Sequence, residues 1–407
     1  MQKFTSLEKL LLFCLLLIPF GTAVHNAVLG IFVISAIVLI ARRRQPAPKL
    51  SLQDTWPLVA AFLMIIWTII TAHLNPKNQF QAYLPYIAGY APLFLLPYLC
   101  RWSAINAKKV FSYFERLIPT MMGLWFLVSA SQSIWGWSMM RAMGEWQNFR
   151  PHGFYSHPLS LAYAALLFWP YSLWRLMKNH RSPAAWLLAA SNFGIIFLTN
   201  SRTCLAVAAL AVFWVILRSL RGRHLVIAGA LAFVSLLTIS LTDNPVSRKM
   251  ILTMQAQDPD RFSHYPDDRL AFWDAHREMI IERPLLGHGA HLDTAYRTPY
   301  YEQLGLADFN KKYNAHNQFI QVMANGGVIG LASFASIFAG LFYLLGSRIK
   351  DPFHRAWMGL SLFVFLLASI TQNAFDDAVV RYSLVMIVCW LYSLLPIKPG
   401  SHKPGLN

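Results

Sequence analysis

Charged residues are scarce in this 407-residue chain, at 13% of the total, against about 25% in a soluble globular protein. Hydrophobic residues make up 56% of the sequence. This composition excludes a soluble enzyme and indicates that lipid is the main solvent of the fold. The net charge of +17 would suggest a nucleic-acid partner if the basic residues clustered on one solvated domain. They are spread along the chain instead, so no nucleic-acid partner is expected.

Acidic residues are missing from the middle of the long apolar runs. Each Asp and Glu falls outside the expected membrane spans or at their edges, as Glu115 and Asp376 do. An ion-coupled transporter usually keeps a carboxylate near the middle of the bilayer, because an ionisable group is costly there and is retained for a task. The sequence therefore disfavours a transporter, which stays a distant alternative.

Cysteine is also rare. The four thiols all lie in or at the ends of apolar runs: Cys14, Cys100, Cys204 and Cys389. The one long polar segment, 243–315, contains none. We therefore expect neither a disulfide nor a thiolate metal site in that segment.

About twelve apolar runs are long enough, or nearly so, to cross the ~30 Å hydrocarbon core as helices. They lie at 7–22, 27–41, 55–73, 84–100, 117–137, 158–177, 183–200, 203–218, 225–242, 318–345, 356–371 and 382–397. The sequence thus predicts an all-α polytopic integral membrane protein with about 12 transmembrane helices and one large, partly helical outer loop.

Basic residues indicate the sidedness of these spans. With a cytoplasmic N-terminus, the inner connections hold 21 Lys and Arg residues and the short outer connections hold five. The positive-inside rule therefore predicts that both termini are cytoplasmic. The polar segment 243–315 then faces outward. Its own charges are uninformative, because long loops translocate largely regardless of charge.

The expected organisation is one integrated domain. Residues 1–242 form transmembrane helices 1–9, residues 243–315 the outer loop that carries site residues, residues 316–397 helices 10–12, and residues 398–407 a cytoplasmic tail. Only short connections remain between these parts, so no second domain fits.

One helix is predicted inside the outer loop. Asp268 is a helix-capping residue and Pro284 a stop signal, so the residues between them, through Glu282, are expected to form about four turns. Helical spacing puts four side chains on one face: Arg269, Trp273, His276 and Ile280. On the pattern alone, a solvated or interfacial helix explains these residues better than a site does.

Two features of the loop resemble metal sites only weakly. His288 and His291 follow the turn that starts at Pro284, but they lack a third ligand at a recognisable spacing. Asp258 and Asp260 fit the Asp-x-Asp pattern of nucleotide-sugar transferases, but the proline between them favours a polar turn. No metal or other cofactor is therefore expected.

The strongest constellation begins the tenth span: His316-Asn317, nine residues, then Gly327-x-x-Gly330. A histidine at the outer mouth of a helix suits acid–base chemistry, because an unperturbed imidazole has a pKa of about 6.5, near operating pH. Glycines allow a neighbouring helix to approach closely. Taken singly, an interfacial histidine, a packing glycine pair and, at Arg202, a snorkelling arginine explain these residues as well or better.

At these residues the sequence resembles the O-antigen ligase family, polytopic inner-membrane enzymes of Gram-negative bacteria. The spacing of His316-Asn317 to Gly327-x-x-Gly330 is similar to the signature of that family. Three further places resemble it: Thr199-Asn200-Ser201-Arg202, Asp268 to Trp273 leading to Pro284-x-x-Gly287, and Asp376 to Arg381. The large loop between the ninth and tenth spans also matches, so the resemblance covers nearly the whole chain.

The resemblance implies a GT-C-like membrane glycosyltransferase that moves O-antigen polysaccharide from undecaprenyl diphosphate to lipid A-core. The reaction would be inverting and metal-independent, at the periplasmic face of the inner membrane, and would complete lipopolysaccharide. It implies His316 as catalytic base. Because the planar guanidinium binds phosphate oxygens bidentately, Arg202 and Arg269 are expected to hold the diphosphate. Further candidates for substrate binding are Asn317, Asp376, Arg150 and Arg381.

Several assignments stay open on the sequence. Asp377 is an alternative to Asp376 for orienting an arginine or histidine, and the aromatic connection 146–157 either contacts substrate or forms an interface belt. The arginine helix, the Pro-x-x-Gly turn and the His-Asn pair also occur in O-antigen polymerases and protein-directed O-oligosaccharyltransferases. Those enzymes use the same donor class and differ in acceptor. Only the spacing of the histidine to the glycine pair favours the ligase.

Overall fold

The computed structural model describes most of the chain. The described residues are 4–18, 22–43, 51–75, 87, 90–102, 106–137, 150–155, 157–219, 268–289, 294–306 and 314–396. Within these ranges the extended regular elements are α-helices, and there is no strand.

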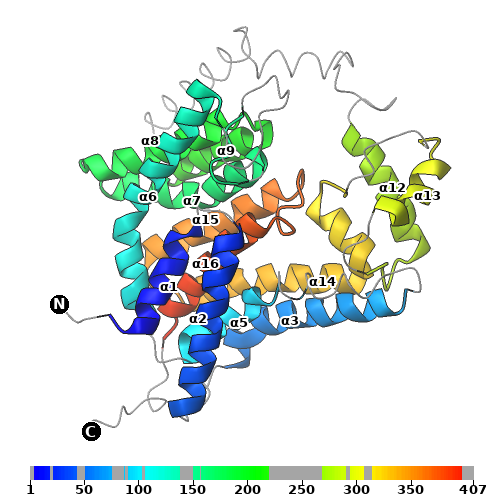
Figure 1. The fold of residues 1–407 in the computed structure, drawn as a ribbon, viewed down its shortest axis with the longest axis horizontal. Helices are drawn as coiled ribbons and strands as arrows, with labels where there is room; N and C mark the ends of the chain where they lie inside the picture. Colours follow the sequence, from blue (N-terminus) through cyan, green and yellow to red (C-terminus); the bar gives the residue numbers. More distant parts are fainter. Residues whose placement is uncertain are drawn as a thin grey trace.

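The helices carry the labels of Figure 1. They are α1 Ser6–Leu16, α2 Thr22–Arg43, α3 Leu52–His73, α5 Pro92–Trp102, α6 Ala107–Trp135, α7 Pro158–Lys178, α8 Pro183–Leu198, α9 Arg202–Ser219, α12 Asp268–Glu282, α13 Thr294–Gln303, α14 Gln318–Ser347, α15 Pro352–Ala368 and α16 Ala378–Leu394. A helix lies on the described part of eleven predicted spans. The ninth span, 225–242, lies outside the described residues, as do parts of 7–22, 84–100 and 382–397. The predicted loop helix is present as α12.

Three helices, α3, α6 and α14, are long and apolar enough to cross a membrane. Shorter apolar helices include part of α2, Ala27–Arg42, together with α8, α15 and α16. Large apolar side chains point away from the core, with Ile34 64% and Leu127 62% exposed. Such surfaces are expected where the neighbour is lipid, and they indicate an integral membrane protein.

The start of α6 differs from the prediction. The helix begins at Ala107 and not at 117, because Asn106 caps it by accepting a hydrogen bond from the Lys109 N–H at 3.0 Å. Glu115 therefore lies inside a helix. There it forms an ion pair of 3.1 Å with Arg175 of α7, which neutralises the one acid that the helix interior contains.

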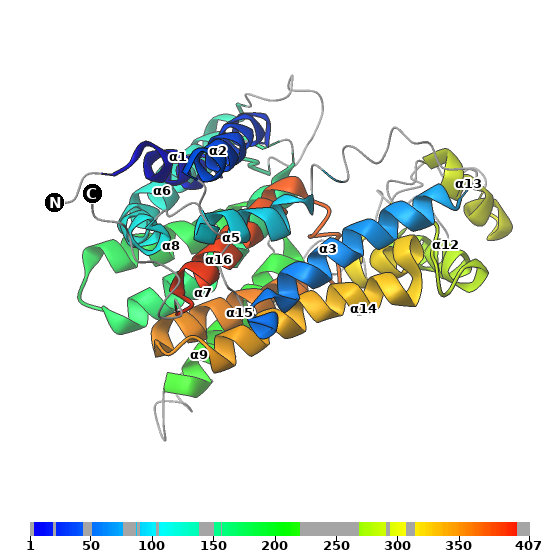
Figure 2. The ribbon, with the colours of Figure 1, turned by 90° about the horizontal axis from the view of Figure 1, so that it is seen from below.

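The centre of the bundle is formed by α7 and α16, which are buried continuously from Ser160 to Leu173 and from Val379 to Tyr392. A helix that is hydrophobic all round is expected to lie inside a large bundle or a membrane domain. Outside this centre, α3 and α14 lie side by side (Figures 1 and 2). Gly340 permits their close approach, because an added Cβ there would lie 2.7 Å from a Pro57 side-chain atom.

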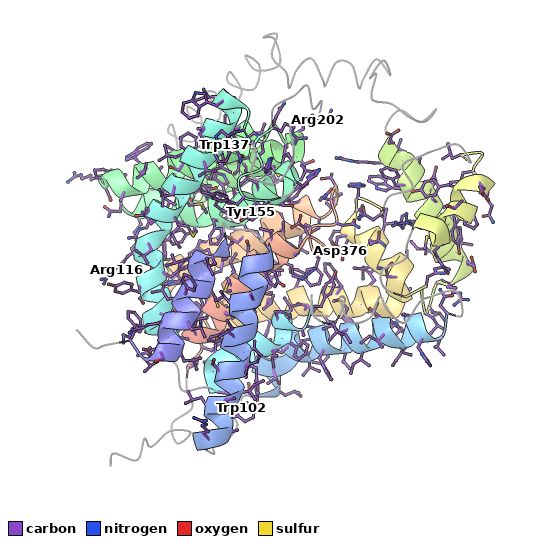
Figure 3. All side chains as sticks on the ribbon, in the orientation of Figure 1. Trp102, Arg116, Trp137, Tyr155, Arg202 and Asp376 are labelled. Carbon is purple, nitrogen blue, oxygen red and sulfur yellow. The ribbon has the colours of Figure 1, made fainter. Side chains whose placement is uncertain are left out.

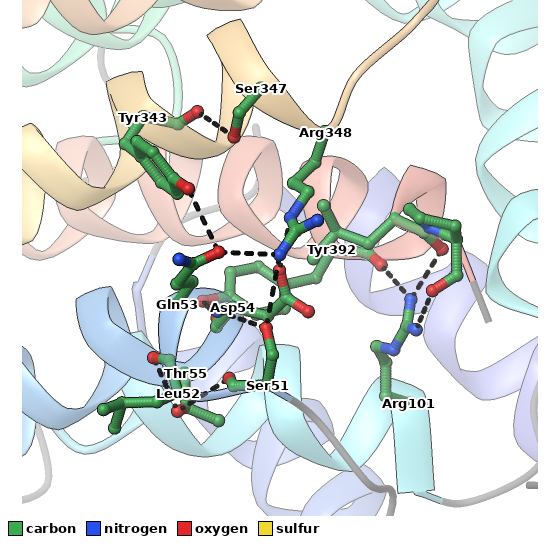
Figure 4. Close-up of polar contacts among 12 residues, drawn as sticks. Ser51, Leu52, Gln53, Asp54, Thr55, Arg101, Tyr343, Ser347, Arg348 and Tyr392 are labelled. Carbon is green, nitrogen blue, oxygen red and sulfur yellow. Dashed lines mark hydrogen bonds and ion pairs between the residues drawn. The ribbon is translucent and has the colours of Figure 1, made fainter. Parts of the chain in front are cut away.

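Polar contacts connect several helix ends at one end of the bundle (Figure 4). The Arg348 Nε, just after α14, lies 3.1 Å from Asp54 Oδ1 in the first turn of α3. The Tyr392 hydroxyl of α16 donates to the Asp54 carbonyl at 2.7 Å. Arg101 of α5 donates to the Leu395 carbonyl at 2.8 Å. All of these are helix ends for which the sequence predicts the cytoplasmic side.

The opposite helix ends make a second set of contacts. The Tyr155 hydroxyl donates to the Ile18 carbonyl after α1 at 2.7 Å, and Gln132 of α6 donates to the Gly153 carbonyl at 2.7 Å. The helices α12 and α13 lie next to the start of α14 (Figure 2). Within the described residues, these contacts connect helix ends that are predicted to be periplasmic. The contacts of Asp54, Arg101 and Arg348 connect helix ends that are predicted to be cytoplasmic.

Candidate active site

The helix α14 is broken at Gly327, whose φ of 62° and ψ of −163° are not helical. A break leaves carbonyl groups without their helical partners, which is costly in a membrane protein unless other donors reach them. Here the carbonyls of residues 324–326 accept hydrogen bonds from the backbone N–H groups of His288 and Gly289 and from the Trp67 indole, at 3.0, 2.7 and 2.8 Å respectively. The loop and α3 therefore supply partners for these three carbonyls.

The turn formed by residues 284–289 is the partner of this break. An added Cβ at Gly327 would lie 2.2 Å from the Leu285 carbonyl oxygen, and one at Gly287 would lie 2.5 Å from backbone atoms of Asn325. Neither distance is possible for a real side chain. The Pro-x-x-Gly turn and the first glycine of the Gly-x-x-Gly pair thus form one backbone contact.

This contact changes the interpretation of the glycine pair. The sequence pattern predicts that both glycines admit a neighbouring helix. Gly327 instead admits the loop turn, because its left-handed φ breaks the helix there. Gly330 does face a helix, with Trp67 of α3 3.9 Å from the position of an added Cβ.

His288 has a structural role. Its ring Nε2 lies 2.7 Å from the Met279 carbonyl and therefore donates, so Nδ1 of the neutral ring accepts from the Tyr296 hydroxyl at 2.6 Å. The Asn75 side chain donates to that hydroxyl at 2.9 Å, which completes a consistent set of donors and acceptors. Both ring nitrogens are thus occupied, and the described residues contain no group of three metal-ligating side chains. Three other candidates lie outside the described residues: Asp258, Asp260 and His291.

The pattern of α12 alone suggests a solvated or interfacial helix. In the structure, α12 packs against other parts of the protein. One face is buried: Ala271, Phe272, Ala275, His276 and Met279. The loop folds back so that α13 and the broken helix α14 cover this face. The Trp273 indole, beside this face, donates to the Ala315 carbonyl at 3.0 Å. This bond places α12 directly beside His316.

His276 remains neutral at physiological pH. The side chain is fully buried, and its Nδ1 donates to the Phe272 carbonyl at 2.7 Å. The pKa of His276 is lowered to about 4. Burial is the main cause, and the nearby Arg297 and His316 make smaller contributions to the lowering. A neutral His276 adds no positive charge beside His316.

His316, the predicted base, occupies a strained backbone position, with a φ of 46°. Its ring stacks on Phe272 of α12, with 5.4 Å between ring centroids and 29° between the planes. Its Nδ1 lies 2.8 Å from the Gln372 side-chain oxygen. Because an amide oxygen only accepts, Nδ1 carries the proton and the neutral ring has its lone pair on Nε2.

The segment that carries Gln372, between α15 and α16, is bonded to the start of α14. The Gln318 N–H donates to the Ser369 carbonyl at 2.8 Å, and the Gln318 side-chain oxygen accepts from the Phe375 N–H at 2.8 Å. Asn373 donates to the Gln321 side-chain oxygen at 3.2 Å. His316 and Gln372 are therefore held in one unit by backbone and amide contacts.

Two predicted site residues have structural tasks at helix ends. Asn317 caps α14, where its side-chain oxygen accepts from the N–H groups of Phe319 and Ile320 at 3.0 and 3.2 Å. Asp377 caps α16 in the same way and accepts from the Ser160 hydroxyl of α7. Substrate contact by Asn317 remains a proposal.

Hydroxyl groups lead from Gln372 toward α9. Its neighbour Thr371 donates to the Thr203 hydroxyl at 3.0 Å, and the Tyr163 hydroxyl of α7 lies 3.5 Å from Thr371. The sequence alone does not predict Gln372, Thr371 or Tyr163 as site residues. Uncharged polar residues at helix ends carry no spacing that distinguishes them from ordinary capping residues, so only the fold identifies them.

Electrostatic interactions connect the predicted arginines to the region of Tyr163. Arg269 of α12 and Arg150 both interact electrostatically with this tyrosine, and Arg150 interacts with Arg202 at the start of α9. Arg150 donates from Nε to the Thr199 carbonyl at 2.7 Å. Burial lowers the pKa of Arg150, with a smaller lowering from Arg202, although an arginine in a protein stays protonated. Figure 3 shows Arg202 on the side of the bundle next to α12, away from Arg116 and Trp102.

The last two predicted residues are Asp376, between α15 and α16, and Arg381, in the first turn of α16. Arg381 is buried and donates to the carbonyls of Phe375 and Asp376 at 2.8 and 3.2 Å, and its guanidinium lies 4.4 Å from the Tyr90 ring centroid. Asp376, labelled in Figure 3, accepts from the Tyr90 hydroxyl and from Asn373. These contacts stabilise the segment that carries Gln372, so both residues support the position of His316 through Gln372.

Part of the chain is similar to a known protein family. Residues 184–335, from α8 into α14, match the family described as O-antigen ligase. The matched range contains Arg202, Arg269, His316 and the glycine pair. No curated protein matches the chain. The apolar helices indicate an integral membrane protein, and the match over this part of the chain supports the O-antigen ligase and polymerase superfamily. The match supports membership of the O-antigen ligase family, as the motifs predicted.

Proposed function

We propose that the protein is an O-antigen ligase. It transfers O-antigen polysaccharide from undecaprenyl diphosphate to a sugar hydroxyl of lipid A-core, at the periplasmic face of the inner membrane. The observation that carries this proposal is the placement of His316. Its ring is oriented by Gln372, and Thr371 beside it leads to the arginine cluster of Arg150, Arg202 and Arg269.

The base acts on the acceptor. With its proton on Nδ1, His316 accepts the hydroxyl proton at Nε2 while the hydroxyl oxygen attacks the anomeric carbon of the donor. The new glycosidic bond forms as the bond between that carbon and the diphosphate oxygen breaks, and undecaprenyl diphosphate leaves. A single displacement of this kind inverts the anomeric configuration.

The arginines act on the leaving group. Negative charge on the already anionic diphosphate grows as the bond breaks, and preorganised guanidinium groups stabilise the more highly charged leaving group more than the ground state. Arg202 occupies the first turn of α9, where the positive end of the helix dipole adds to the effect. Because these cations supply the neutralisation, we expect activity to survive EDTA.

The topology supports two lipid-anchored substrates. We propose twelve spans in a GT-C-like arrangement, with both termini cytoplasmic and residues 243–315 periplasmic. The separation of polar contacts into two groups at the two helix ends supports this arrangement. Both substrates then enter laterally from the outer leaflet.

A deletion strain tests the acceptor. For a ligase, the strain makes lipopolysaccharide without O-antigen, and full-length polymer accumulates on its lipid carrier. A polymerase would leave a single repeat unit on the core, and a protein-directed enzyme would leave lipopolysaccharide unchanged and strip glycan from a protein. A transporter would leave lipid-linked glycan on the cytoplasmic side. Gel electrophoresis of lipopolysaccharide and of the lipid-linked pool separates these outcomes, and each of the last three overturns the proposal.

A further inference from the structure

A groove of about 840 Å³ lies far from the candidate active site, between the ends of α7, α9 and α15 and the side of α14. Its basic residues Lys178 and Arg218 end α7 and α9, whose other ends, at Pro158 and Arg202, border the site. Helices of 18 and 21 residues are about 27 and 32 Å long. The groove and the site therefore lie at opposite ends of these two helices.

Three cations line the groove: Lys178, Arg218 and Arg355. The Lys178 ammonium lies 4.8 Å from the ring centroid of Phe353 on another helix, and the Arg218 guanidinium lies 5.1 Å from that of Trp214. Cation–π contacts of this kind hold a charged group over an aromatic wall without neutralising it. Among the described residues that line the groove there is no carboxylate, and the neighbouring Asp351 pairs with His354, so the described walls do not neutralise the three cations.

The remaining walls are apolar and open to the lipid. Phe363 and Trp214 are 48% and 45% exposed, and Leu360 forms part of the floor. A ligand that fits such a groove needs an anionic head at the helix ends and hydrocarbon below it. A soluble anion would use only the first feature, and a neutral lipid only the second.

We propose that this groove binds an anionic phospholipid of the leaflet opposite the active site. The phosphate lies among the three cations, and an acyl chain lies against Phe363 and Leu360. A general positive-inside surface would spread its cations over flat helix ends, whereas here they converge on one concave site of a volume typical for ligand pockets. The inference concerns the lipid environment of the protein and is independent of the reaction proposed above.

The test uses the purified, delipidated full-length chain and native mass spectrometry. The probes are dioleoylphosphatidylglycerol, dioleoylphosphatidylcholine and inorganic phosphate. The groove variant combines Lys178→Gln, Arg218→Gln and Arg355→Gln. The matched control combines Lys9→Gln, Lys108→Gln and Arg116→Gln, three exposed basic positions on helices outside the groove, so that both proteins lose the same charge.

We expect the wild-type chain to bind phosphatidylglycerol in preference to the other two probes. Each cation near a lipid head is worth about fivefold in affinity, so the groove variant should bind it about 100-fold more weakly and the control variant much as the wild type does. Equal losses in both variants would overturn the proposal in favour of a general surface effect. Equal wild-type binding of phosphatidylcholine or of inorganic phosphate would also overturn it.

A second variant keeps the proposal testable if the charge variant does not fold. Ala356→Phe adds bulk inside the groove and leaves all three cations in place. It should weaken phosphatidylglycerol binding, and unchanged binding would overturn the assignment. Loss of a dimer species from the groove variant, without loss of lipid, would assign the groove to a second copy of the chain instead.

Discussion

Gly327 and Leu285 are in direct backbone contact: an added Cβ on Gly327 would lie 2.2 Å from the Leu285 carbonyl oxygen. This contact joins the turn after α12 to the break in α14. His316 lies just before the start of α14, and its ring stacks on Phe272 of α12. The contact therefore fixes the distance between the helix that carries Arg269 and the histidine.

Gly327→Ala should reduce transfer strongly. The new Cβ meets backbone that cannot move aside, and the left-handed φ adds a cost of about 1–2 kcal/mol. The turn must shift, and a displacement of about 1 Å at a catalytic site can cost ~10²-fold in rate. Transfer assayed with purified donor and acceptor measures the effect.

Two alanine substitutions in the same helix are its controls. Gly346 has open space at the Cβ position, and Gly330 has only an ordinary contact of 3.5 Å with the Val322 carbonyl. Gly346→Ala should be neutral and Gly330→Ala mild. If Gly330→Ala is as damaging as Gly327→Ala, the backbone contact is not the reason for the motif.

His316→Ala should abolish transfer, since removal of a general base costs ~10² to 10⁴ in rate, while membrane insertion and yield stay normal. Gln372 acts through His316 and has a distinct signature. Gln372→Ala should lower the rate about five- to tenfold, the value of one hydrogen bond of about 1 kcal/mol or slightly more.

Gln372→Glu separates positioning from a merely structural role. Glutamate keeps the accepting oxygen 2.8 Å from Nδ1, so it should preserve most of the activity that alanine loses. Its negative charge favours the protonated imidazole, so the acid limb of the pH–rate profile should move to higher pH. An unshifted profile in the glutamate variant would remove Gln372 from the mechanism.

The spans and the loop helix could be predicted because they depend on local patterns. Apolar runs and the Asp and Pro boundary signals place α3, α12 and α14 within a few residues of their observed ends. The start of α6 was missed because the Asn106 cap precedes a polar first turn that resembles a connection. Hydropathy detects the apolar part of a helix and not its capped end.

The site residues were only partly predictable. Charged groups such as Arg202 and Arg269 are conspicuous in a chain that has few charges, and His316 is marked by its motif. Gln372 is not marked, because its role exists only once the segment between α15 and α16 packs against the start of α14. The buried role of Arg381 was hidden for the same reason.

Lysine should be a poor replacement for the arginines that hold the diphosphate. Arg202→Lys and Arg269→Lys keep the charge and lose the bidentate fork, at about 1.5–3 kcal/mol for one charge-assisted hydrogen bond. We expect a loss of kcat of about 10- to 10²-fold. Arg277→Lys is the control, because Arg277 lies on α12, the helix that carries Arg269, where it is exposed and pairs with Glu278. Full activity of both site variants would exclude the clamp.

The stability of the folded loop should depend on His276. Its pKa of about 4 in the folded protein lies below the ordinary 6.5 of an unfolded chain. The unfolded chain therefore binds the proton more readily, so stability falls as the pH drops from about 6.5 to about 4, by up to roughly 3 kcal/mol. His276→Gln should flatten this part of the curve of thermal stability in detergent. An identical pH dependence in both proteins would contradict the assignment.

The side of the membrane on which the site lies can be tested by labelling. The four native cysteines are all buried, so a single new thiol can be detected against a low background. Arg277, on α12, and Arg181, between α7 and α8, are both exposed and lie on opposite predicted sides. In intact spheroplasts an impermeant maleimide should label the Arg277→Cys protein and not the Arg181→Cys protein. After the cells are permeabilised, both should react. The reverse pattern in intact cells would place His316 in the cytoplasm, where a periplasmic ligation reaction is impossible, and would remove the proposed function together with the topology.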